Sequence, residues 1–257
     1  MVFLIYQLTL ILIILISPLI ILYRILKNKE DSVRFREKFC FFSKSRKSGK
    51  LIWFHASSVG ELMSILPIIN YYENKKNINQ ILITSTTLSS AKILKKIKLK
   101  KTIHQFFPLD LIFFSRIFLN YWKPSMAIFV ESEIWPGMYK FINKRKIPLI
   151  LLNARITKKT FNRWYFFKKY SLSIFKNISA SYPQNIETIN YLKKLKVKII
   201  KYIGNLKFIG NPYENKKEFE KTLKSRLKKH LIWVAASTHD NEEILCAEAH
   251  MILKRKF

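Results

Sequence analysis

Short apolar runs alternate with amphipathic stretches along most of this chain, and this alternation limits the possible folds more than any other feature. The apolar runs predict strands at Leu51–His55, Ile81–Ser85, Ile103–Pro108, Met126–Glu131, Leu149–Asn153, Ser179–Tyr182 and Val197–Ile203. The stretches between them repeat apolar residues at helical spacing and predict helices at Glu61–Tyr72, Ser89–Ile97, Leu109–Trp122, Trp135–Asn143, Lys158–Phe175 and Asn185–Leu195. Strands that alternate with helices form βαβ units with right-handed crossovers. We therefore expect an α/β fold with helices on both faces of a doubly wound parallel sheet.

The end of the chain predicts the beginning of a second domain. A segment rich in charge and asparagine, 211–230, indicates a linker with a connecting helix. An apolar run at Leu231–Ala236 then predicts one more strand, and a helix is expected from about Asp240 onward. One strand and one helix cannot bury their own apolar faces. We expect residues 27–210 to form one Rossmann-like domain and residues 211–257 to hold the linker and the first βα unit of another.

The first 26 residues predict a single helix that anchors the protein in a membrane. Residues 1–23 carry no charged side chain. A helix from Val2 to Tyr23 is about 33 Å long, which is enough for a hydrocarbon core of about 30 Å. A cleaved signal peptide would need a basic segment before the run and a small-residue cleavage site after it, and the sequence has neither.

Basic residues follow this apolar run and set its expected orientation. Arg24, Lys27, Lys29 and Arg34 come directly after it. Segments rich in Lys and Arg stay on the cytoplasmic side, so we expect the rest of the chain to be cytoplasmic, with these cations near anionic lipid head groups. Pro18 can kink the helix, so an anchor that is embedded without spanning is an alternative.

The formal net charge of +31, from 47 basic and 16 acidic residues, is not specific for one kind of partner. Lysine, isoleucine and asparagine are all abundant, which is the composition that an AT-rich genome imposes whatever the function. The lysines are spread along the chain without a nucleic-acid-binding motif, so we expect membrane lipids and no nucleic acid as partners. Cys40 and Cys246 have no zinc-ligand spacing, and the five glycines form no phosphate-binding loop.

Polar residues cluster where the predicted strands end, which is where ligands bind in such folds. After the first strand come Ser57, Ser58, Gly60 and Glu61. Small residues let a ligand approach the backbone, and the free N–H groups of a helix N-terminus suit an anion. Glu61 is a candidate general base. The alternative is that Glu61 complements the helix dipole while Ser58 caps the helix.

Two carboxylates, Glu131 and Glu133, follow the fourth predicted strand. Repulsion between them would raise one pKa, which suits proton transfer or the binding of hydroxyls or a cation. The alternative is a solvated loop with Trp135 in the core.

Candidate anion-binding residues follow two later strands. Arg155 comes after the fifth predicted strand and suits phosphate or carboxylate, although a structural ion pair would explain it equally well. Asn205 and Lys207 follow the seventh predicted strand. Lys207 is either a phosphate ligand or one more surface lysine.

The last predicted strand is followed by Ser237, Thr238, His239 and Glu242. Ser237 or Thr238 would cap the next helix, whose N–H groups suit a phosphate. His239 and the following carboxylates lack a third compact metal ligand, so we favour capping over metal binding. Together these turns favour an enzyme that acts on an anionic, phosphorylated substrate at a membrane.

Five motifs occur in a fixed order: HASSVGE from residue 55, ESEIWP from 131, NARIT from 153, GNLKF from 204 and ASTHDNEE from 236. Behind a membrane anchor, this set resembles the 3-deoxy-D-manno-oct-2-ulosonic acid (Kdo) transferases of Gram-negative bacteria, over residues 1–250. These enzymes transfer Kdo from CMP-Kdo to the lipid A precursor. The resemblance implies a glycosyltransferase of lipopolysaccharide biosynthesis in the inner membrane, with its catalytic body on the cytoplasmic face.

The resemblance also implies a fold and a set of site residues. The family has the GT-B fold, with the active site between an N-terminal acceptor-binding domain and a C-terminal domain that binds CMP-Kdo. By this resemblance Glu61 is the proton acceptor, and Glu131 and Lys207 stabilise the transition state of an inverting transfer. The implied substrate-binding residues are Ser57, Ser58, Gly60, Glu133, Arg155, Asn205, Ser237, Thr238, His239 and Glu242. The family implies no metal ion and no cofactor besides the donor substrate.

The chain departs from the family pattern at its end. In the family the last helix leads into further strands that bind CMP, whereas this sequence stops at Phe257. We therefore expect a C-terminally truncated transferase with an incomplete donor-binding domain. The alternative is a non-catalytic membrane-bound protein that retains only lipid A precursor binding.

Overall fold

The computed structural model describes residues 1–208, 225, 227–228 and 231–256. The chain divides into two compact units, Met1–Pro212 and Tyr213–Phe257. The linker and connecting helix predicted for 211–230 therefore lie almost wholly outside the described residues.

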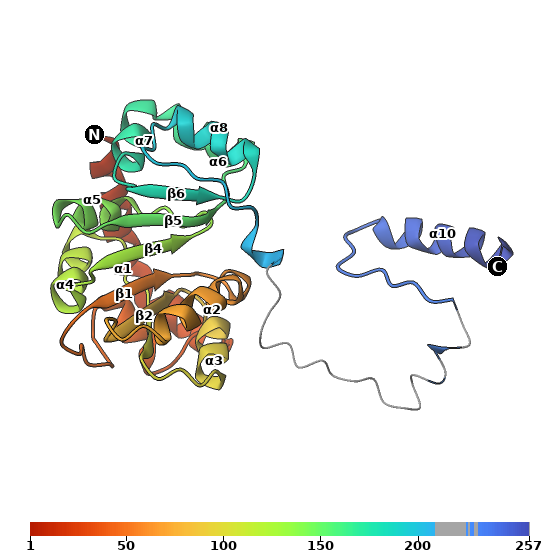
Figure 1. Ribbon diagram of the computed structural model, residues 1–257, viewed down its shortest axis with the longest axis horizontal. Coiled ribbons are helices and arrows are strands. Elements are labelled where there is room, and N and C mark those ends of the chain that lie inside the picture. The colour runs from red at the N-terminus through yellow and green to blue at the C-terminus, as the bar shows by residue number, and fades with distance from the viewer. Residues whose placement is uncertain (209–224, 226, 229–230, 257) are drawn as a thin grey trace. The chain divides into compact units, whose positions relative to one another are not determined.

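A six-stranded parallel sheet forms the centre of the first unit (Figure 1). Its strands are β1 (Leu51–His55), β2 (Gln80–Ser85), β3 (Thr102–Phe106), β4 (Met126–Val130), β5 (Leu149–Ala154) and β6 (Ala180–Pro183). They lie in the order β3-β2-β1-β4-β5-β6, and all neighbours are parallel. The chain adds β2 and β3 on one side of β1 and then returns to add the other strands on the opposite side. The predicted α/β class and doubly wound parallel sheet are confirmed.

Helices connect the strands and cover both faces of the sheet. They are α2 (Val59–Glu73), α3 (Leu88–Lys96), α4 (Ile112–Trp122), α5 (Pro136–Lys144), α6 (Lys158–Phe166), α7 (Lys168–Phe175) and α8 (Ile186–Lys194). Side chains of α2 and α3 pack with Ile52 and Phe54 on one face, and those of α4, α5 and α7 pack with Trp53 and Phe129 on the other. Successive residues of a strand point to opposite faces. Because both faces are covered, the strands appear in the sequence as continuous apolar runs.

The seventh strand predicted in the first domain, Val197–Ile203, is wrong. The segment is described throughout and forms a single bridge, between Ile200 and Ser181 of β6. β6 ends at Pro183, which has no N–H to donate to a further strand. Apolar side chains of the segment, such as that of Tyr202, consequently stay exposed.

Two other predicted elements differ in the structure. The helix predicted over Lys158–Phe175 is divided into α6 and α7, because Phe167 leaves the helical backbone angles (φ −102°, ψ 56°). The strand predicted at Leu231–Ala236 is not formed among the described residues of the second unit, where Leu231–Val234 is exposed. A single strand has no neighbour with which to form a ladder. The helix predicted after it is present as α10 (Glu242–Lys256).

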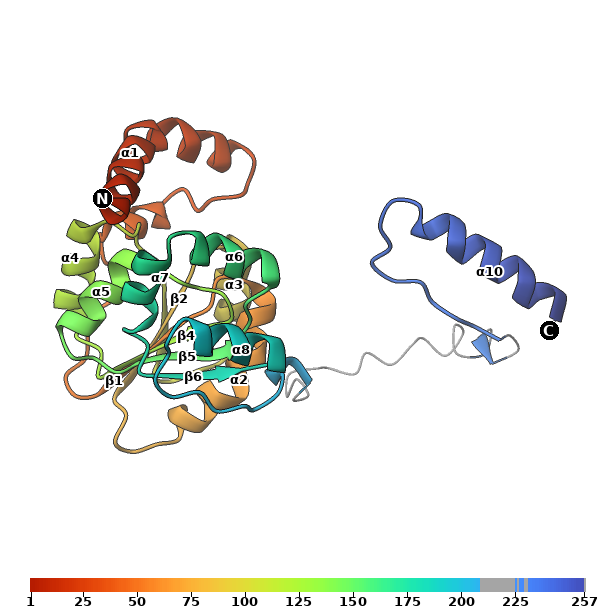
Figure 2. The same cartoon turned by 90° about the horizontal axis from the view of Figure 1, so that it is seen from above.

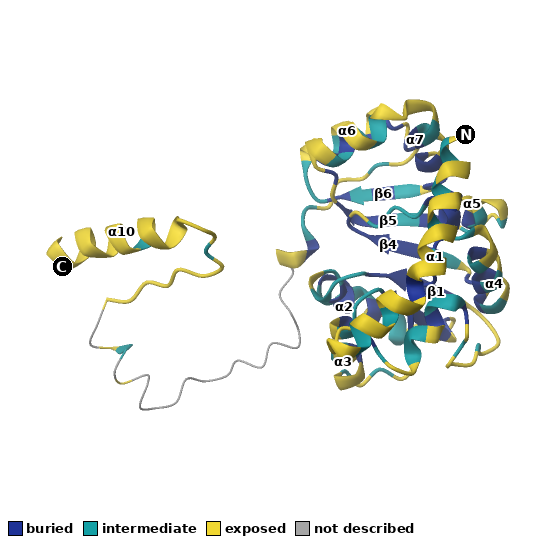
Figure 3. Ribbon diagram, turned by 180° about the vertical axis from the view of Figure 1, so that it is seen from behind, coloured by how far each residue is buried: buried dark blue, intermediate teal, exposed yellow. Residues whose placement is uncertain are grey.

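The chain forms α1 (Val2–Leu26) and the 3-10 helix η1 (Arg34–Phe39) before it enters the sheet. Among the described helices, α1 is the one with the length and mean hydropathy (2.6) needed to cross a membrane. This agrees with the predicted anchor helix. α1 arches over one side of the first unit (Figure 2), and most of its surface is exposed (Figure 3).

Gly137, at the start of α5, is expected to tolerate no side chain. A Cβ there would lie 2.5 Å from the backbone oxygen of Asp110, whereas a Cβ at Gly60 would meet the flexible end of Lys207 at 3.9 Å. Overpacking against rigid backbone costs about 1–3 kcal/mol. We expect Gly137→Ala to lower the melting temperature of the detergent-solubilised protein and Gly60→Ala to leave it unchanged. Equal melting temperatures for the two variants would contradict this arrangement.

Candidate active site

The direction in which strands are added to the sheet reverses between β1 and β4, and this reversal brings two loops to one edge of the sheet. The loop after β1 leads into α2, and Glu61 lies in the first turn of α2. The loop after β4 carries Glu131 and Glu133. Such a reversal opens a crevice at the carboxyl ends of the strands. Lys207 reaches the same place from the 3-10 helix η2 (Leu206–Phe208). The structure thus brings together the three residues predicted to be catalytic.

Hydrogen bonds hold the Glu61 carboxylate at the N-terminus of α2. Ser58 is the N-cap, and its hydroxyl oxygen accepts from Glu61 N (3.2 Å). The same hydroxyl donates to Glu61 Oε1 (3.0 Å), and Ser57 N donates to Glu61 Oε2 (2.8 Å). These contacts resemble a capping box, so the capping role offered as an alternative is present. A carboxylate oxygen can accept more than one hydrogen bond, and Glu61 therefore keeps capacity for a substrate hydroxyl.

The surroundings of Glu61 make its carboxylate more basic. Burial raises its pKa from the ordinary value of 4.5, and repulsion from Glu133 and Glu131 acts in the same direction. The hydrogen bonds from Ser57 and Ser58 oppose this shift, but the pKa remains raised. A carboxylate with a raised pKa is better matched to accept a proton near neutral pH.

Glu131 follows β4 directly and is buried with a partner of opposite charge. Its backbone is left-handed (φ 57°), a conformation that costs a non-glycine residue about 1 kcal/mol or more. Its side chain is 10% exposed, and its Oε1 lies 2.6 Å from Lys207 Nζ. A buried carboxylate without such a partner would be strongly destabilising. The ion pair thus explains how a charge can occupy this position.

Asn153 fixes the segment that carries Lys207. Its Oδ1 accepts from Leu206 N (3.1 Å), and its Nδ2 donates to Asn205 Oδ1 (3.4 Å). Asn205 Oδ1 in turn accepts from Lys207 N (3.0 Å). Asn153 also has a left-handed backbone (φ 51°) at the end of β5. These bonds tie η2 to the sheet edge beside Glu131.

Lys207 lies between Glu131 and the N-terminus of α2. A Cβ placed on Gly60 would be 4.0 Å from Lys207 Nζ. The Lys207 side chain is 42% exposed, so its ammonium group is accessible to a ligand. The partial positive charge of a helix N-terminus adds to that of the ammonium group. Together they form a place where negative charge on a ligand would be stabilised.

Glu133 is bonded to the sheet. Its Oε2 accepts from Trp135 Nε1 (2.8 Å) and lies 3.1 Å from Nε2 of the buried His55. Burial raises the pKa of Glu133, but hydrogen bonds from His55, Trp135 and Ser57 outweigh burial, and the pKa is lowered. The raised pKa at this edge therefore belongs to Glu61. The predicted repulsion between Glu131 and Glu133 had indicated a raised pKa for one of those two residues instead. The solvated loop of the alternative is wrong, because both carboxylates are bonded within the fold, but Trp135 packs against the core as that alternative predicted.

Of the remaining predicted binding residues in the first unit, Arg155 contacts this cluster through its backbone, because Arg155 N donates to the Glu131 carbonyl (3.4 Å). Arg155 follows β5 with an exposed side chain, and its carbonyl accepts from Ser132 Oγ. Four others belong to the second unit: Ser237, Thr238, His239 and Glu242. There, Thr238 Oγ1 donates to Glu243 Oε1 (3.2 Å) and His239 N donates to Glu242 Oε2 (2.9 Å). Within the described ranges, no group of three or more His, Cys, Asp or Glu residues could hold a metal ion.

Sequence reasoning did not select His55 or Asn153 as site residues. Both are polar and fully buried, and both stand at or near the carboxyl end of an apolar strand. Buried polar groups need hydrogen-bond partners, so a polar residue at the end of an apolar run predicts contacts there. That signal could have identified both residues.

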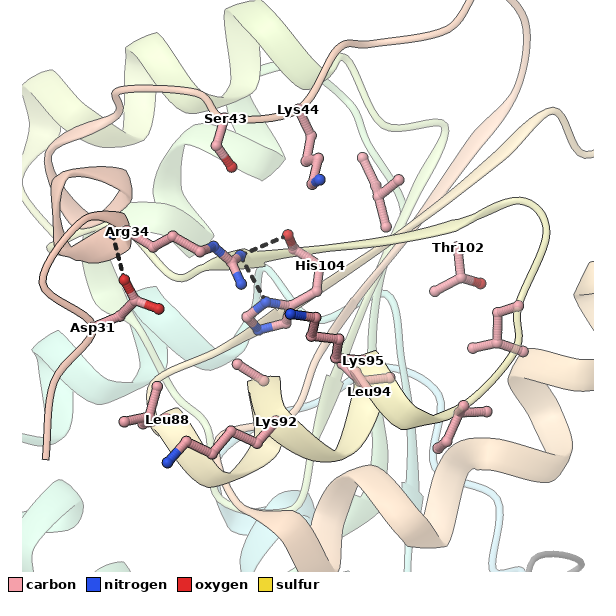
Figure 4. Close-up of a pocket in the computed structure, with 14 residues that line it drawn as sticks. Asp31, Arg34, Ser43, Lys44, Leu88, Lys92, Leu94, Lys95, Thr102 and His104 are labelled. Atoms are coloured by element: carbon pink, nitrogen blue, oxygen red, sulfur yellow. Dashed lines mark hydrogen bonds between the residues drawn. The ribbon is translucent and has the colours of Figure 1, made fainter. Parts of the chain in front are cut away.

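A separate pocket of about 650 Å³ lies between α3, β3 and the segment before β1 (Figure 4). Arg34, Lys44, Lys92 and Lys95 are among the residues that line it. His104 in its wall is neutral, because burial and then the charge of Arg34 lower its pKa to about 3. None of the predicted site residues lines this pocket. The candidate active site is therefore the sheet edge and not this pocket.

Comparison with known proteins identifies the class of protein to which this parallel α/β sheet belongs, with Glu61, Glu131 and Lys207 at its edge. A family model described as 3-deoxy-D-manno-octulosonic-acid transferase (Kdo transferase) matches residues 33–209. The chain belongs to the Kdo transferase family, which consists of glycosyltransferases of lipopolysaccharide biosynthesis.

Several curated proteins resemble the chain over most of its length. The 3-deoxy-D-manno-octulosonic acid transferase of Rickettsia bellii is 37% identical over 88% of this chain and 54% of its own length. A probable mitochondrial transferase of the same name from Arabidopsis thaliana is 34% identical over 93% of this chain and 56% of its own length. The transferase of Haemophilus influenzae is 28% identical over 80% of this chain and 49% of its own length. The chain thus spans about half the length of the curated relatives it matches.

Among solved structures, UDP-GlcNAc 2-epimerase from Neisseria meningitidis bound to UDP-GlcNAc matches with a TM-score of 0.42 and 14% identity. The match covers 62% of this chain and 46% of that chain. This similarity is too low to support an inference.

The raised pKa of Glu61 predicts a pH-dependent stability. The folded state binds this proton more tightly than the unfolded chain, so the free energy of unfolding falls as the pH rises from about 4.5 through the raised pKa. Glu61→Gln cannot ionise and should show a smaller fall. Unfolding of the detergent-solubilised protein, followed by circular dichroism from pH 4.5 to neutral pH, measures this. Glu187→Gln, at an exposed position of α8, is the control and should keep the wild-type slope. Identical slopes for all three proteins would show that Glu61 titrates normally.

Proposed function

We propose that this chain is a glycosyltransferase that moves Kdo from CMP-Kdo to the glucosamine disaccharide of the lipid A precursor, with inversion at C2 of Kdo. Membership of the Kdo transferase family supports the reaction class. The observation that carries the proposal is the cluster of Glu61, Glu131 and Lys207 at the sheet edge. It combines a base of raised pKa with a cation held by a buried carboxylate.

In the proposed mechanism Glu61 is the proton acceptor. Its carboxylate takes the proton of a glucosamine hydroxyl as the hydroxyl oxygen attacks C2 of Kdo and CMP leaves. Burial and the neighbouring carboxylates raise the pKa of Glu61, which strengthens the base. Ser57 N and the Ser58 hydroxyl fix the orientation of the carboxylate before the acceptor arrives.

Lys207 and Glu131 are proposed to stabilise the transition state. Negative charge develops on the leaving phosphate, and a positioned ammonium group lowers the energy of that charge. Glu131 holds Lys207 Nζ by an ion pair of 2.6 Å, and Asn153 holds the backbone of η2. The cation is thus in place before the reaction and needs no reorganisation.

We assign the other predicted residues to substrate binding by the two parts of a GT-B enzyme. Residues 27–210 are proposed to bind the lipid acceptor and residues 211–257 to begin the donor-binding domain. Ser57, Ser58, Gly60, Glu133, Arg155 and Asn205 belong to the first part, and Ser237, Thr238, His239 and Glu242 to the second. The reaction needs no cofactor beyond CMP-Kdo in this proposal, because the proton acceptor and the cation are side chains.

The proposed location is the inner membrane, with α1 as the single anchor and the body on the cytoplasmic face. α1 is apolar and long enough to hold the protein in a bilayer. The basic residues that follow it favour the cytoplasmic side. A lipid acceptor is confined to the membrane, so an anchored enzyme meets it at high local concentration.

Transfer by the 257-residue protein in lipid nanodiscs tests the proposal. CMP-Kdo and tetra-acylated lipid A precursor are supplied, and Kdo added to the lipid is detected by mass spectrometry. We expect Kdo-dependent product, and we expect Glu61→Ala and Lys207→Met each to lower the rate by about 100- to 1,000-fold. Lys201→Met, at an exposed lysine in the same segment, is the matched control and should keep the wild-type rate.

Other outcomes would overturn parts of the proposal. Wild-type rates in Glu61→Ala would remove Glu61 as the base. Binding of the lipid A precursor without any transfer would favour the alternative function, a membrane-bound protein that retains only acceptor binding.

A further inference from the structure

α1 is attached to the body of the first unit near its beginning. Tyr6 OH donates to Asp110 Oδ2 (2.8 Å), and Gln7 Nε2 donates to the Asp110 carbonyl (3.1 Å). Gln7 Oε1 accepts from Ile112 N (2.9 Å). Gln7 is only 6% exposed, and these bonds satisfy an amide that would otherwise be costly to bury. The first turns of α1 are therefore part of the packed surface of the protein.

α1 is also linked to the body near its end, where Arg24 and Lys38 of η1 both pair with the Glu30 carboxylate. Its last turns face η1 across an apolar groove of about 450 Å³. η1 is bonded to the sheet, since Glu37 Oε2 accepts from Phe106 N (2.8 Å) and the Lys38 carbonyl accepts from Leu109 N (3.0 Å). The first turns of α1 thus rest on the loop after β3, and its last turns face η1, which is itself bonded to β3 and to that loop.

The residues of α1 that face the protein form one stripe along its whole length. The buried and half-buried positions recur at helical spacing: Val2, Phe3, Tyr6, Gln7, Leu10, Ile14, Ser17, Ile21, Arg24 and Ile25. This pattern is typical of a helix that packs lengthwise on a protein. The polar Gln7 and Ser17 lie within the stripe, while Leu4, Leu15 and Leu19 outside it are exposed. The helix therefore has a face turned to the protein and an exposed face (Figure 3), and large apolar side chains dominate the exposed face.

The contacts at both ends decide between two placements in a membrane. Hydropathy alone would predict a spanning helix. Gln7 and Arg24 lie about 25 Å apart along the helix. If the helix spanned a hydrocarbon core of about 30 Å, Arg24 would lie near one membrane surface and Gln7 near the opposite surface. Asp110 and Ile112 belong to a loop and a helix start of the body, and such backbone is not tolerated among lipid chains. The bonds of Gln7 are compatible only with a helix whose two ends stay on one side.

We propose that α1 is a non-spanning anchor that lies along the membrane, with its outer face among the acyl chains and both ends on the side that holds the body. The partner of the outer face is lipid hydrocarbon, because the large exposed side chains there are apolar along the helix and the exposed Thr9 hydroxyl is bonded to the Ile5 carbonyl of the same helix. Lys27 and Lys29, exposed just beyond the helix, suit the anionic head groups at the same surface. This placement does not depend on the proposed reaction.

Cysteine labelling in oriented vesicles tests the placement. One protein carries a single cysteine in a neutral Gly/Ser tag before Met1, and another carries Ser48→Cys, at an exposed position of the body. Both have Cys246→Ser, and the parent without added cysteine corrects for the buried Cys40. The label is a membrane-impermeant maleimide. We expect both cysteines to be labelled in vesicles of one orientation and neither to be labelled in vesicles of the opposite orientation. Labelling of the two cysteines from opposite sides would overturn the proposal.

Hydrogen exchange of the Ile112 amide tests the docking itself in lipid nanodiscs. Ile112 is the first residue of α4, where an amide has no partner within its own helix, and Gln7 supplies the acceptor. We expect slow exchange in the wild type and faster exchange in Gln7→Leu. Thr9→Leu is the control, because Thr9 is exposed and bonds to Ile5 of its own helix, and it should leave the rate unchanged. Equally fast exchange in all three proteins would mean that the start of α1 is not docked.

Discussion

The candidate site depends on one topological constraint, the reversal between β1 and β4 of the direction in which parallel strands are added to the sheet. On one side of this point the chain builds outward through β2 and β3, and on the other side through β5 and β6. The loops that leave β1 and β4 therefore diverge and leave room above the two strands. Glu61 enters that room from one loop, and Glu131 from the other. Lys207 arrives from a third segment, η2, which Asn153 ties to the sheet edge.

The motifs of the first unit hold one another in place. His55 of HASSVGE lies within hydrogen-bond distance of Glu133 of ESEIWP, and Glu131 of the second motif is paired with Lys207 of GNLKF. Asn153 of NARIT bonds to the backbone of GNLKF. Each motif thus supplies a partner for a buried polar group of another. Loss of one partner would leave a buried charge or amide unsatisfied, which explains physically why these motifs occur together.

Much of this fold was predictable, because strands buried on both faces leave a plain apolar pattern. The failure at Val197–Ile203 arose because apolar content does not reveal whether a neighbouring edge can accept a strand, and Pro183 limits that edge. The convergence of Glu61 and Glu131 followed from their places after strands. Lys207 was expected at the same edge after the predicted strand Val197–Ile203, which is not formed, and η2 positions it instead. The capping contacts of Glu61, the His55–Glu133 bond and the left-handed Asn153 were not predicted, because they depend on three-dimensional partners and backbone angles.

Asp110 belongs to two parts of the molecule at once. Its carboxylate accepts from Gly137 N (2.7 Å) and Met138 N (2.6 Å) at the start of α5, and from Tyr6 of α1. α5 follows directly on the loop that carries Glu131. With α1 in the membrane as proposed, this side chain joins the anchor to the helix next to the proposed catalytic carboxylates and helps to set their height above the lipid surface. The distance of these carboxylates from the bilayer would then be fixed. A lipid would be selected by how far its sugar projects from the bilayer before any sugar hydroxyl is recognised.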